Sequence, residues 1–590
     1  MARNTYDVDE NLETPFNIKH LKRAGKYVAK YKGKLITALL LSGIASGAEL
    51  FTPILTEKAL DVYIPDKNIN GLLFMVAGVI LCYAVSIMFA TIRSRIITDM
   101  GQSIIYDIRK DLFAHLQKLP FSYYDDRPQG KILIRVVNYV NSVSNMLSNG
   151  LLNVILEVIN MVFILFFMFS MNVKLSFVIL AGLPVFALVM IIIKKYQRKA
   201  WQDVSNKSSN LNAYLQENLT GVKVTKIFAR EKENAEIFDR LSDKHRKSWM
   251  KAVGISNVVW PAVDNIAVWV RGAIYLVGLL VLGPMAVPVG VILSMSTYAF
   301  RFWMPIMNLS NLYNDFINNI AYLERIFETM DEPVDVDDAP DAGIMPEIKG
   351  DVTFNNVTFS YEPGKPVLKN VSFEVKAGES VALVGQTGAG KSTIVNLLSR
   401  FYNLDSGEIL IDGVDISKVT LHSLRSQMGI MLQDSFLFTG SIGDNIRYGR
   451  LDATDEEVKK AASAVCADRF INNMDEGYDT PVNERGSTLS QGQRQLISFA
   501  RTLISSPKIL VLDEATSSID VQTERDLQKG LNELLKGRTS FIIAHRLSTI
   551  RNCDKIMVIG DGRITESGTH EQLMALKGEY YNLYTSQMQS

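Results

Sequence analysis

A run of eight residues in the second half of the chain has the composition of a phosphate-binding loop. Residues 385–392 read Gly-Gln-Thr-Gly-Ala-Gly-Lys-Ser, directly after the apolar run 380–384 and before a helical pattern. Glycines let backbone N–H groups approach phosphate oxygens, and the start of a helix adds a favourable potential there. The Lys391 ammonium would reach the β and γ phosphates of a nucleotide, and the Ser392 hydroxyl would ligate Mg²⁺. The nucleotide-contacting residues predicted in this region are Gly385, Gln386, Thr387, Gly388, Ala389, Gly390, Lys391, Ser392 and Thr393.

Two adjacent carboxylates could complete a hydrolytic site. Asp513 and Glu514 follow the apolar run 509–512, so we expect them at the carboxyl end of a buried strand, where ligands of such sheets gather. Asp513 would hold Mg²⁺, directly or through water, and Glu514 would act as the general base toward an attacking water. A pair of solvated acids at the end of a strand is the alternative interpretation.

The elements that must position these residues lie in the last 240 or so positions, 350–590, where strand and helix patterns alternate. Apolar runs at 380–385, 508–514 and 539–546 are each followed by a helical pattern. Runs of this kind are typical of a buried, largely parallel sheet. We predict an α/β P-loop nucleotide-binding domain over 350–590, preceded by an acidic, proline-containing linker over 326–349.

The first 310 residues contain six apolar stretches long enough to cross a membrane. About 30 Å of hydrocarbon requires roughly 20 helical residues. The stretches lie near 35–57, 71–92, 151–170, 175–193, 258–282 and 287–310. Six crossings place both termini on one side, and the seven lysines and arginines between positions 19 and 34 make that side the cytoplasm. We therefore predict an α-helical six-span transmembrane domain over 35–325, in front of the nucleotide-binding domain.

Two long segments, 93–150 and 194–253, continue the helical pattern and carry many basic residues, so we expect them in the cytoplasm. Within the first, Pro128 and Gly130 predict a turn. Residues 1–34 would form a cytoplasmic N-terminus with an elbow helix. That helix is either amphipathic and interfacial or simply basic and solvated.

The composition excludes several classes of protein. The 590 residues include 62 Lys plus Arg and 62 Asp plus Glu, so nothing predicts a nucleic-acid partner. The three cysteines are far apart and show no metal-ligand spacing. The polar, acidic start does not fit a cleavable signal peptide, so we expect the first apolar stretch to stay in the mature protein.

Residues 489–493, Leu-Ser-Gln-Gly-Gln, make a resemblance to a known family specific. They match the Leu-Ser-Gly-Gly-Gln signature of ABC transporters except at Gln491. In that family the signature of one subunit closes over the ATP held by the other, so hydrolysis requires two nucleotide-binding domains. Ser490 could cap the following helix and also donate to a γ-phosphate oxygen, whereas an isolated pentapeptide of this kind could be a helix cap alone. The resemblance assigns ATP contacts to Ser490, Gly492 and Gln493.

Three further residues are assigned by the same resemblance. Tyr361 would stack on adenine, Gln433 would sense Mg²⁺ or water and couple to the membrane domain, and His545 would contact the γ phosphate. The residues that could ligate Mg²⁺ are then Ser392, Gln433 and Asp513. The catalytic residues would be Glu514 and His545.

The membrane half is also similar to ABC exporters, at Tyr124-Asp125 with Gly130 and Arg135, and at Glu217 with Gly221. The resemblance implies short coupling helices in the two intracellular loops, seated on the nucleotide-binding domains. The second of these loops typically crosses to the partner subunit.

These features predict ATP-driven export of amphipathic compounds, drugs or lipids, by alternating access across a bacterial plasma membrane. Because the chain has one membrane domain and one nucleotide-binding domain, it needs a second half-transporter. Gln491 and Leu496 resemble the catalytically competent subunit of heterodimeric bacterial exporters, so a heterodimer is favoured over a homodimer. A nucleotide-gated channel or regulatory receptor on the same fold, and a soluble ATPase tethered to the membrane, are the alternatives.

Charged residues within the apolar stretches are costly in lipid, so each should face the bundle interior or an aqueous cavity. The residues concerned are Glu49, Glu157, Asp264, Arg271 and Arg301. For Arg271, substrate contact and structural ion pairing are both open.

Overall fold

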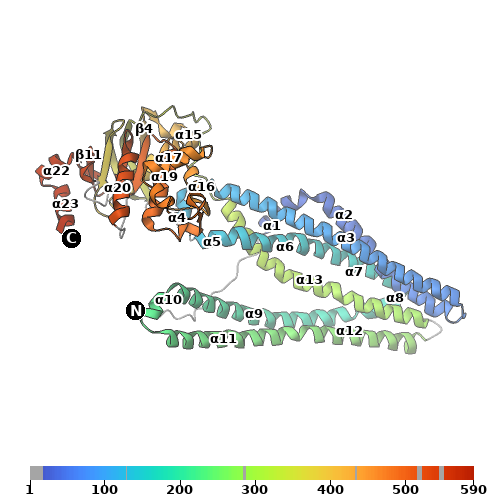
Figure 1. The fold of residues 1–590 in the computed structure, drawn as a ribbon. Helices are drawn as coiled ribbons and strands as arrows, with labels where there is room; N and C mark the ends of the chain where they lie inside the picture. The colour runs from blue at the N-terminus through green and yellow to red at the C-terminus, as the bar shows by residue number, and fades with distance from the viewer. Residues whose placement is uncertain are drawn as a thin grey trace. The chain divides into compact units, whose positions relative to one another are not determined.

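The computed structural model of the chain describes residues 18–125, 127, 129–283, 287–431, 435–513, 521–543 and 550–589. The chain divides into two compact units (Figure 1). The first unit joins Met1–Leu116 to Gln129–Asp331, and the second joins Gln117–Pro128 to Glu332–Ser590. The first unit is helical, and the second combines helices with β-sheets.

The first unit is built from long helices. They are α1 (Ile18–Ala29), α2 (Lys32–Lys58), α3 (Ile69–Leu116), α5 (Gln129–Ile134), α6 (Val140–Asn145), α7 (Leu151–Met171), α8 (Val173–Leu180), α9 (Gly182–Thr220), α10 (Val222–Ile227), α11 (Glu231–Asn257), α12 (Val259–Leu276) and α13 (Val289–Met330). Short π-helical segments lie at Ala59–Tyr63, Arg135–Tyr139, Met146–Gly150 and Val277–Val281.

Within the described residues, five helical stretches are long and apolar enough to cross a membrane. They are Lys32–Tyr63, Ile69–Leu116, Asn153–Met171, Val173–Thr220 and Glu231–Val281. The sixth predicted crossing, 287–310, lies in α13 and stays a prediction.

The expectation that helices continue far beyond the membrane is confirmed. Helix α3 has 48 residues, which at 1.5 Å per residue is about 70 Å, more than twice the roughly 30 Å of a hydrocarbon core. Pro128, around which a turn is predicted, lies outside the described residues; α3 ends at Leu116 and α5 begins at Gln129.

Contacts between α2 and α13 centre on a proline. Pro53 lies inside α2 and has no N–H, so the Glu49 carbonyl four residues earlier loses its helical partner. Arg301 donates to that carbonyl at 3.3 Å and pairs with the Glu49 carboxylate at 3.1 Å. The Tyr298 hydroxyl donates to the Leu50 carbonyl at 2.6 Å. Two of the predicted intramembrane charges, Glu49 and Arg301, therefore pair with each other one turn before Pro53.

The other three intramembrane charges have different surroundings. The Asn308 amide donates to the Glu157 carboxylate at 2.6 Å. The Arg271 guanidinium lies 5.8 Å from the centre of the Phe300 ring, a cation–π contact, and no ion pair of Arg271 is found in the part of the chain that the structure describes. Asp264 is exposed on the surface of the single chain.

Helix α1 is attached to the protein through charged and polar side chains. Arg23 donates to both carboxylate oxygens of Asp331 at 2.6 Å, just after the end of α13. Lys30 and the Tyr31 hydroxyl both donate to Asp107 of α3, at 2.8 and 3.0 Å. The elbow helix thus packs on α3 and α13 with one side, which the sequence interpretation of an interfacial or solvated helix did not include.

The second unit contains two main sheets. Its strands are β1 (Val352–Glu362), β2 (Lys365–Val375), β3 (Ser380–Val384), β4 (Ser406–Ile411), β5 (Val414–Asp415), β6 (Met428–Met431), β7 (Gly440–Ser441), β8 (Pro481–Val482), β9 (Ile509–Asp513), β10 (Thr539–Ile543), β11 (Lys555–Gly560) and β12 (Arg563–Gly568). Its helices are α4 (Phe121–Asp125), α14 (Lys391–Leu398), α15 (Leu421–Arg425), α16 (Ile442–Arg447), α17 (Asp455–Ala464), α18 (Asp468–Ile471), α19 (Gln491–Ile504), α20 (Val521–Leu535), α22 (His570–Leu576) and α23 (Glu579–Gln589).

The larger sheet has the order β12-β11-β3-β10-β9-β6, and all of its neighbouring strands are parallel except β11 and β12. The smaller sheet, β2-β1-β4-β5, is antiparallel. Strand β10 is buried along its whole length and pairs with β3 and β9 at once, Ile543 lying opposite Leu383 and Asp513. The predicted buried, largely parallel sheet is confirmed, and the carboxyl ends of β3, β9 and β10 share one edge.

Candidate ATP-binding site

The loop after β3 has the backbone shape that its glycines permit. Gly385 has a φ of +150° and Gly390 a φ of +109°, values that residues with a side chain rarely adopt. A Cβ atom on Gly385 would lie 2.2 Å from the Ile559 carbonyl oxygen, and one on Gly390 would lie 2.7 Å from the Leu368 side chain. The loop therefore requires glycine at both positions, independently of any ligand.

Lys391, the first residue of α14, points back into this loop. Its ammonium donates to the carbonyl oxygens of Gly385 and Gln386, both at 2.9 Å. The residue is 8% exposed, and this burial lowers the pKa of the ammonium, while the negative charge of Asp513 partly restores it. A cation is thus held at the centre of the loop, beside the carboxylate that ends β9.

The oxygen ligands here fit Mg²⁺. Mg²⁺ takes few protein oxygens and completes its coordination with phosphate oxygens and water. Ser392 begins α14 beside Lys391, and Asp513 is close enough to Lys391 to affect its pKa. The described residues contain no cluster of three or more His, Cys, Asp or Glu side chains that could hold a metal without such help. Bound there, Mg²⁺ would neutralise charge on the β and γ phosphates.

Tyr361 is placed beside the loop. Its hydroxyl oxygen lies 3.2 Å from the Thr393 hydroxyl oxygen. Its ring makes edge-to-face contacts with the rings of Phe359 and Tyr402, with ring centres 4.8 and 5.1 Å apart. The residue is 47% exposed, so part of the aromatic surface is free to contact a flat base. Stacking on adenine stays a prediction.

The signature residues form the start of α19. The Ser490 hydroxyl accepts from the Gln493 N–H at 3.2 Å, and the Gln493 side chain accepts from the Ser490 N–H at 2.9 Å. This reciprocal pair is a capping box, and it satisfies two backbone donors of the helix. The helix cap predicted for Ser490 is confirmed, while contacts of Ser490, Gly492 and Gln493 with a nucleotide stay predictions.

Three predicted site residues, Gln433, Glu514 and His545, lie outside the described residues. The strands that precede them are described. Met431, the last residue of β6, pairs with Leu512 of β9. The next residue of β9, Asp513, pairs with Ile543, the last residue of β10. All three strands end at the edge of the sheet that carries the phosphate-binding loop.

The family resemblance implies a short coupling helix in the first intracellular loop, and α4 of that loop folds with the second unit, but the residues that form its seat were not identified from the sequence. The centres of the Phe121 and Phe401 rings lie 4.2 Å apart, and the Arg425 guanidinium lies 5.1 Å from the centre of the Phe401 ring. The Tyr402 hydroxyl donates to the Asp125 carboxylate. The sequence does contain one indication of this seat. Two adjacent aromatic residues, Phe401 and Tyr402, follow directly after the helix of the phosphate-binding loop.

Comparisons with known proteins agree with this geometry. The family model described as ABC transporter transmembrane region matches residues 35–306, and the one described as ABC transporter matches residues 368–517. The chain therefore belongs to the ABC transporter family, and it combines the membrane and ATP-hydrolysing parts of an exporter in one polypeptide.

Particular relatives cover nearly the whole chain. An uncharacterized ABC transporter ATP-binding protein of Bacillus subtilis, YknV, is 40% identical over all of this chain and 98% of its own length. A fatty acid ABC transporter ATP-binding/permease protein of Mycobacterium tuberculosis is 38% identical over 83% of this chain and 78% of its own length. An ATP-dependent lipid A-core flippase of Syntrophus aciditrophicus is 34% identical over 96% and 94%.

A solved structure shares the fold of both units. The structure of a bacterial Atm1-family ABC exporter with ATP bound matches with a TM-score of 0.79 and 30% identity, over 95% of this chain and 99% of that one. The protein is thus an ABC exporter whose ATP hydrolysis is coupled to transport.

Proposed function

We propose that the chain is a half-transporter that exports amphipathic compounds, lipids or drugs, by alternating access. The coupling of ATP hydrolysis to transport is supported by the unit to which α4 belongs. Residues Gln117–Pro128 connect two helices of the membrane unit, α3 and α5, yet they fold with the ATP-binding unit. A segment of the membrane domain is therefore built into the machinery that binds ATP.

The contacts of α4 suit a mechanical link. The Phe401 ring contacts both the Phe121 ring and the Arg425 guanidinium. The Arg425 guanidinium also donates to the carbonyls of Ser399 and Arg400, just after α14. Helix α14 begins at the phosphate-binding loop. A movement of α14 on ATP binding would therefore be transmitted to α4 through these contacts.

ATP would shift the transporter between inward-facing and outward-facing states. This requires that closed nucleotide-binding domains bind ATP more tightly than open ones, by several kcal/mol for a near-complete switch. Lys391 would hold the β and γ phosphates, Glu514 would activate the attacking water, and His545 would contact the γ phosphate. The signature of the second half-transporter, equivalent to Ser490–Gln493, would close the site.

We infer a division of the chain into an elbow over 1–34, a six-span membrane domain over 35–325, a linker over 326–349 and an ATP-binding domain over 350–590. Both termini would be cytoplasmic, in the plasma membrane of a bacterium. The five described apolar stretches and the 42 residues of α13 support six crossings.

The second half-transporter is proposed to be a different chain. Gln491 departs from the usual glycine of the signature, as in the competent subunits of heterodimeric exporters. The amphipathic class of substrate is supported by the relatives whose names mention fatty acid, lipid A-core and multidrug transport.

The test is ATP hydrolysis by the full-length chain, purified alone into phospholipid nanodiscs. Glu514→Gln serves as the control for contaminating activity. Hydrolysis that this substitution abolishes would establish a working homodimer and would overturn the heterodimer. A folded, ATP-binding but inactive protein, which becomes active with a co-expressed second half-transporter, would support the heterodimer. Substrate-independent ion conduction would instead support a channel.

A further inference from the structure

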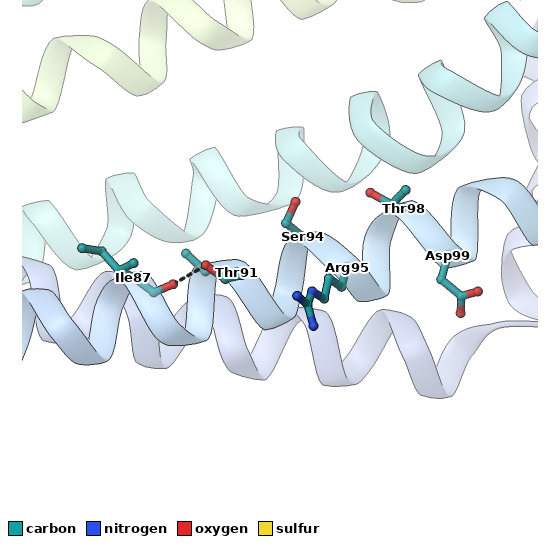
Figure 2. Close-up of a pocket in the computed structure, with 7 residues that line it drawn as sticks. Ile87, Thr91, Ser94, Arg95, Thr98 and Asp99 are labelled. Carbon is teal, nitrogen blue, oxygen red and sulfur yellow. Dashed lines mark hydrogen bonds between the residues drawn. The ribbon is translucent and has the colours of Figure 1, made fainter.

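One face of α3 forms an open pocket of about 650 Å³. Its lining comes from a single helix, with Ile87 and Ala90 at one end and Ser94, Arg95, Thr98 and Asp99 at the other. Figure 2 shows Ser94 and Thr98 on one side of the α3 ribbon and Arg95 and Asp99 on the other. An apolar end and a polar end therefore meet along one helix face.

The polar end of the pocket presents hydrogen-bond donors that have no side-chain partner among the described residues. In the part of the chain that the structure describes, Ser94, Arg95 and Thr98 have no hydrogen-bond or ion-pair partner from another side chain, and all three are exposed. Thr91, between the two ends, already donates its hydroxyl hydrogen to the Ile87 carbonyl at 2.8 Å. Two hydroxyls and one guanidinium thus remain for a ligand that accepts hydrogen bonds.

The local charge is positive. Lys34 of α2 pairs with the Asp99 carboxylate at 2.5 Å and neutralises it. The Arg95 charge, one helical turn before Asp99, is left uncompensated. A ligand that fits this end must therefore carry negative charge as well as hydrogen-bond acceptors.

The pocket lies at the depth of lipid headgroups. The stretch of α3 from Ile69 to Ile92 contains no charged residue, and Arg93 and Arg95 are the first charges after it. Lys34, which reaches Asp99, belongs to the group of basic residues in front of the first membrane stretch. Ile87 and Ala90 then fall inside the hydrocarbon, and Ser94 to Asp99 fall at the interface.

We propose that this face of α3 is a binding site for an amphiphile with an anionic headgroup, a phosphate or a carboxylate. The guanidinium of Arg95 and the hydroxyls of Ser94 and Thr98 bind the headgroup, and an acyl chain lies along Ile87 and Ala90. The site needs only that α3 crosses the membrane, so it does not depend on the proposed export. The headgroup belongs either to a lipid that stays bound or to the exported compound.

The probe is a photoactivatable phosphatidylglycerol, with the reactive group in its acyl chain, in vesicles of phosphatidylcholine that contain the full-length protein in its assembled form. Mass spectrometry then locates the labelled peptides. We expect labelling within residues 87–99, and an Arg95→Gln substitution should reduce it about ten-fold, because it removes the charge-assisted hydrogen bond to the headgroup. A photoactivatable phosphatidylcholine should label this segment weakly in both proteins.

The matched control is Lys32→Gln, which removes an exposed cation at the same interface but outside the pocket. It should leave the labelling of residues 87–99 unchanged. Equal losses in the two variants would show general surface electrostatics and overturn the site. Absence of labelling in the wild-type protein, as expected if a partner subunit covers this face, would overturn it too. Unchanged ATP binding by Arg95→Gln verifies the fold.

A second arm identifies the source of the headgroup. The outward movement of a fluorescent phosphatidylglycerol is followed in the same vesicles with and without ATP. ATP-dependent movement that Arg95→Gln slows would assign the site to the transported compound. Labelling without movement would assign it to a resident lipid. Failure to move any amphiphile would overturn the proposed export while leaving the labelling result intact.

Discussion

At the residue scale, Lys391 combines a structural and a chemical role. Its ammonium donates to two loop carbonyls, and its burial lowers its pKa relative to an exposed lysine. A buried cation of this kind is stabilised further when phosphate oxygens arrive, because they compensate the charge that burial penalises.

Lys391→Ala should therefore reduce ATP hydrolysis by about a hundred-fold or more, as expected for loss of a principal contact to transferring phosphate. The measurement is steady-state ATPase activity together with binding of a fluorescent ATP analogue. Lys369→Ala, on β2 of the same unit, provides the control. Retention of most activity by Lys391→Ala would contradict the site.

Gly385 gives a stability prediction at the same scale. Gly385→Ala places a Cβ atom 2.2 Å from a backbone oxygen, whereas Gly378, which also has a positive φ of +83°, faces open space. Gly385→Ala should cost about 3 kcal/mol in the free energy of unfolding, and Gly378→Ala about 1 kcal/mol. Thermal unfolding of the two purified proteins compares them, and equal losses would show that backbone strain alone matters.

At the element scale, the elbow helix α1 depends on charge. The hydrogen bond from Lys30 holds the pKa of the Asp107 carboxyl below its usual range. A lowered pKa in the folded state stabilises docking above the unfolded pKa, near 4, and the stabilisation is lost as the pH falls through the lowered value. Docking of α1 should therefore be constant near neutral pH and weaken only in strong acid.

Lys30→Gln should speed hydrogen exchange of residues 18–31 by about two- to five-fold, the small effect expected from loss of one exposed ion pair. Lys26→Gln, which removes an exposed lysine within α1, should leave exchange unchanged. Hydrogen exchange followed by mass spectrometry makes the comparison. Faster exchange in both variants would indicate that total charge, and not the Asp107 contact, holds the elbow.

The seat of α4 yields a prediction about coupling. Phe121→Ala removes the ring that lies on Phe401 without touching the phosphate-binding loop. ATP binding should persist, while substrate transport per ATP hydrolysed should fall by about ten-fold, the effect of losing roughly 1.4 kcal/mol of packing. Phe113→Ala, which replaces an exposed ring on α3, is the matched control. Equal loss of hydrolysis and transport in Phe121→Ala would contradict a coupling role.

At the scale of the whole molecule, local patterns predicted the parallel sheet and the strand ends well. Apolar runs such as 509–512 indicate a strand that is buried on both faces of its sheet. The spacing of the glycines indicates the backbone conformation of the phosphate-binding loop. The attachment of α1 to Asp107 and the seat of α4 on Phe401 could not be predicted in this way. Both join residues about 80 to 280 positions apart, and side-chain contacts at such separations leave no periodic signal in one sequence.

The boundary between the two units falls between Asp331 and Glu332. Asp331 is bonded to Arg23 of the elbow, and Glu332 pairs with Arg127 at 3.1 Å, beside α4. Two neighbouring carboxylates are thus held by two different units. A Gly-Ser insertion between them should leave ATP hydrolysis intact and lower transport about ten-fold, whereas the same insertion at Asp66, in the turn before α3, should have little effect.

Asp331 and Glu332 are consecutive, yet each carboxylate is held by an arginine of its own unit. The last held side chain of one unit is therefore followed directly by the first held side chain of the other. Among related sequences we accordingly expect insertions to be rarer between these two positions than within the exposed turns of either unit.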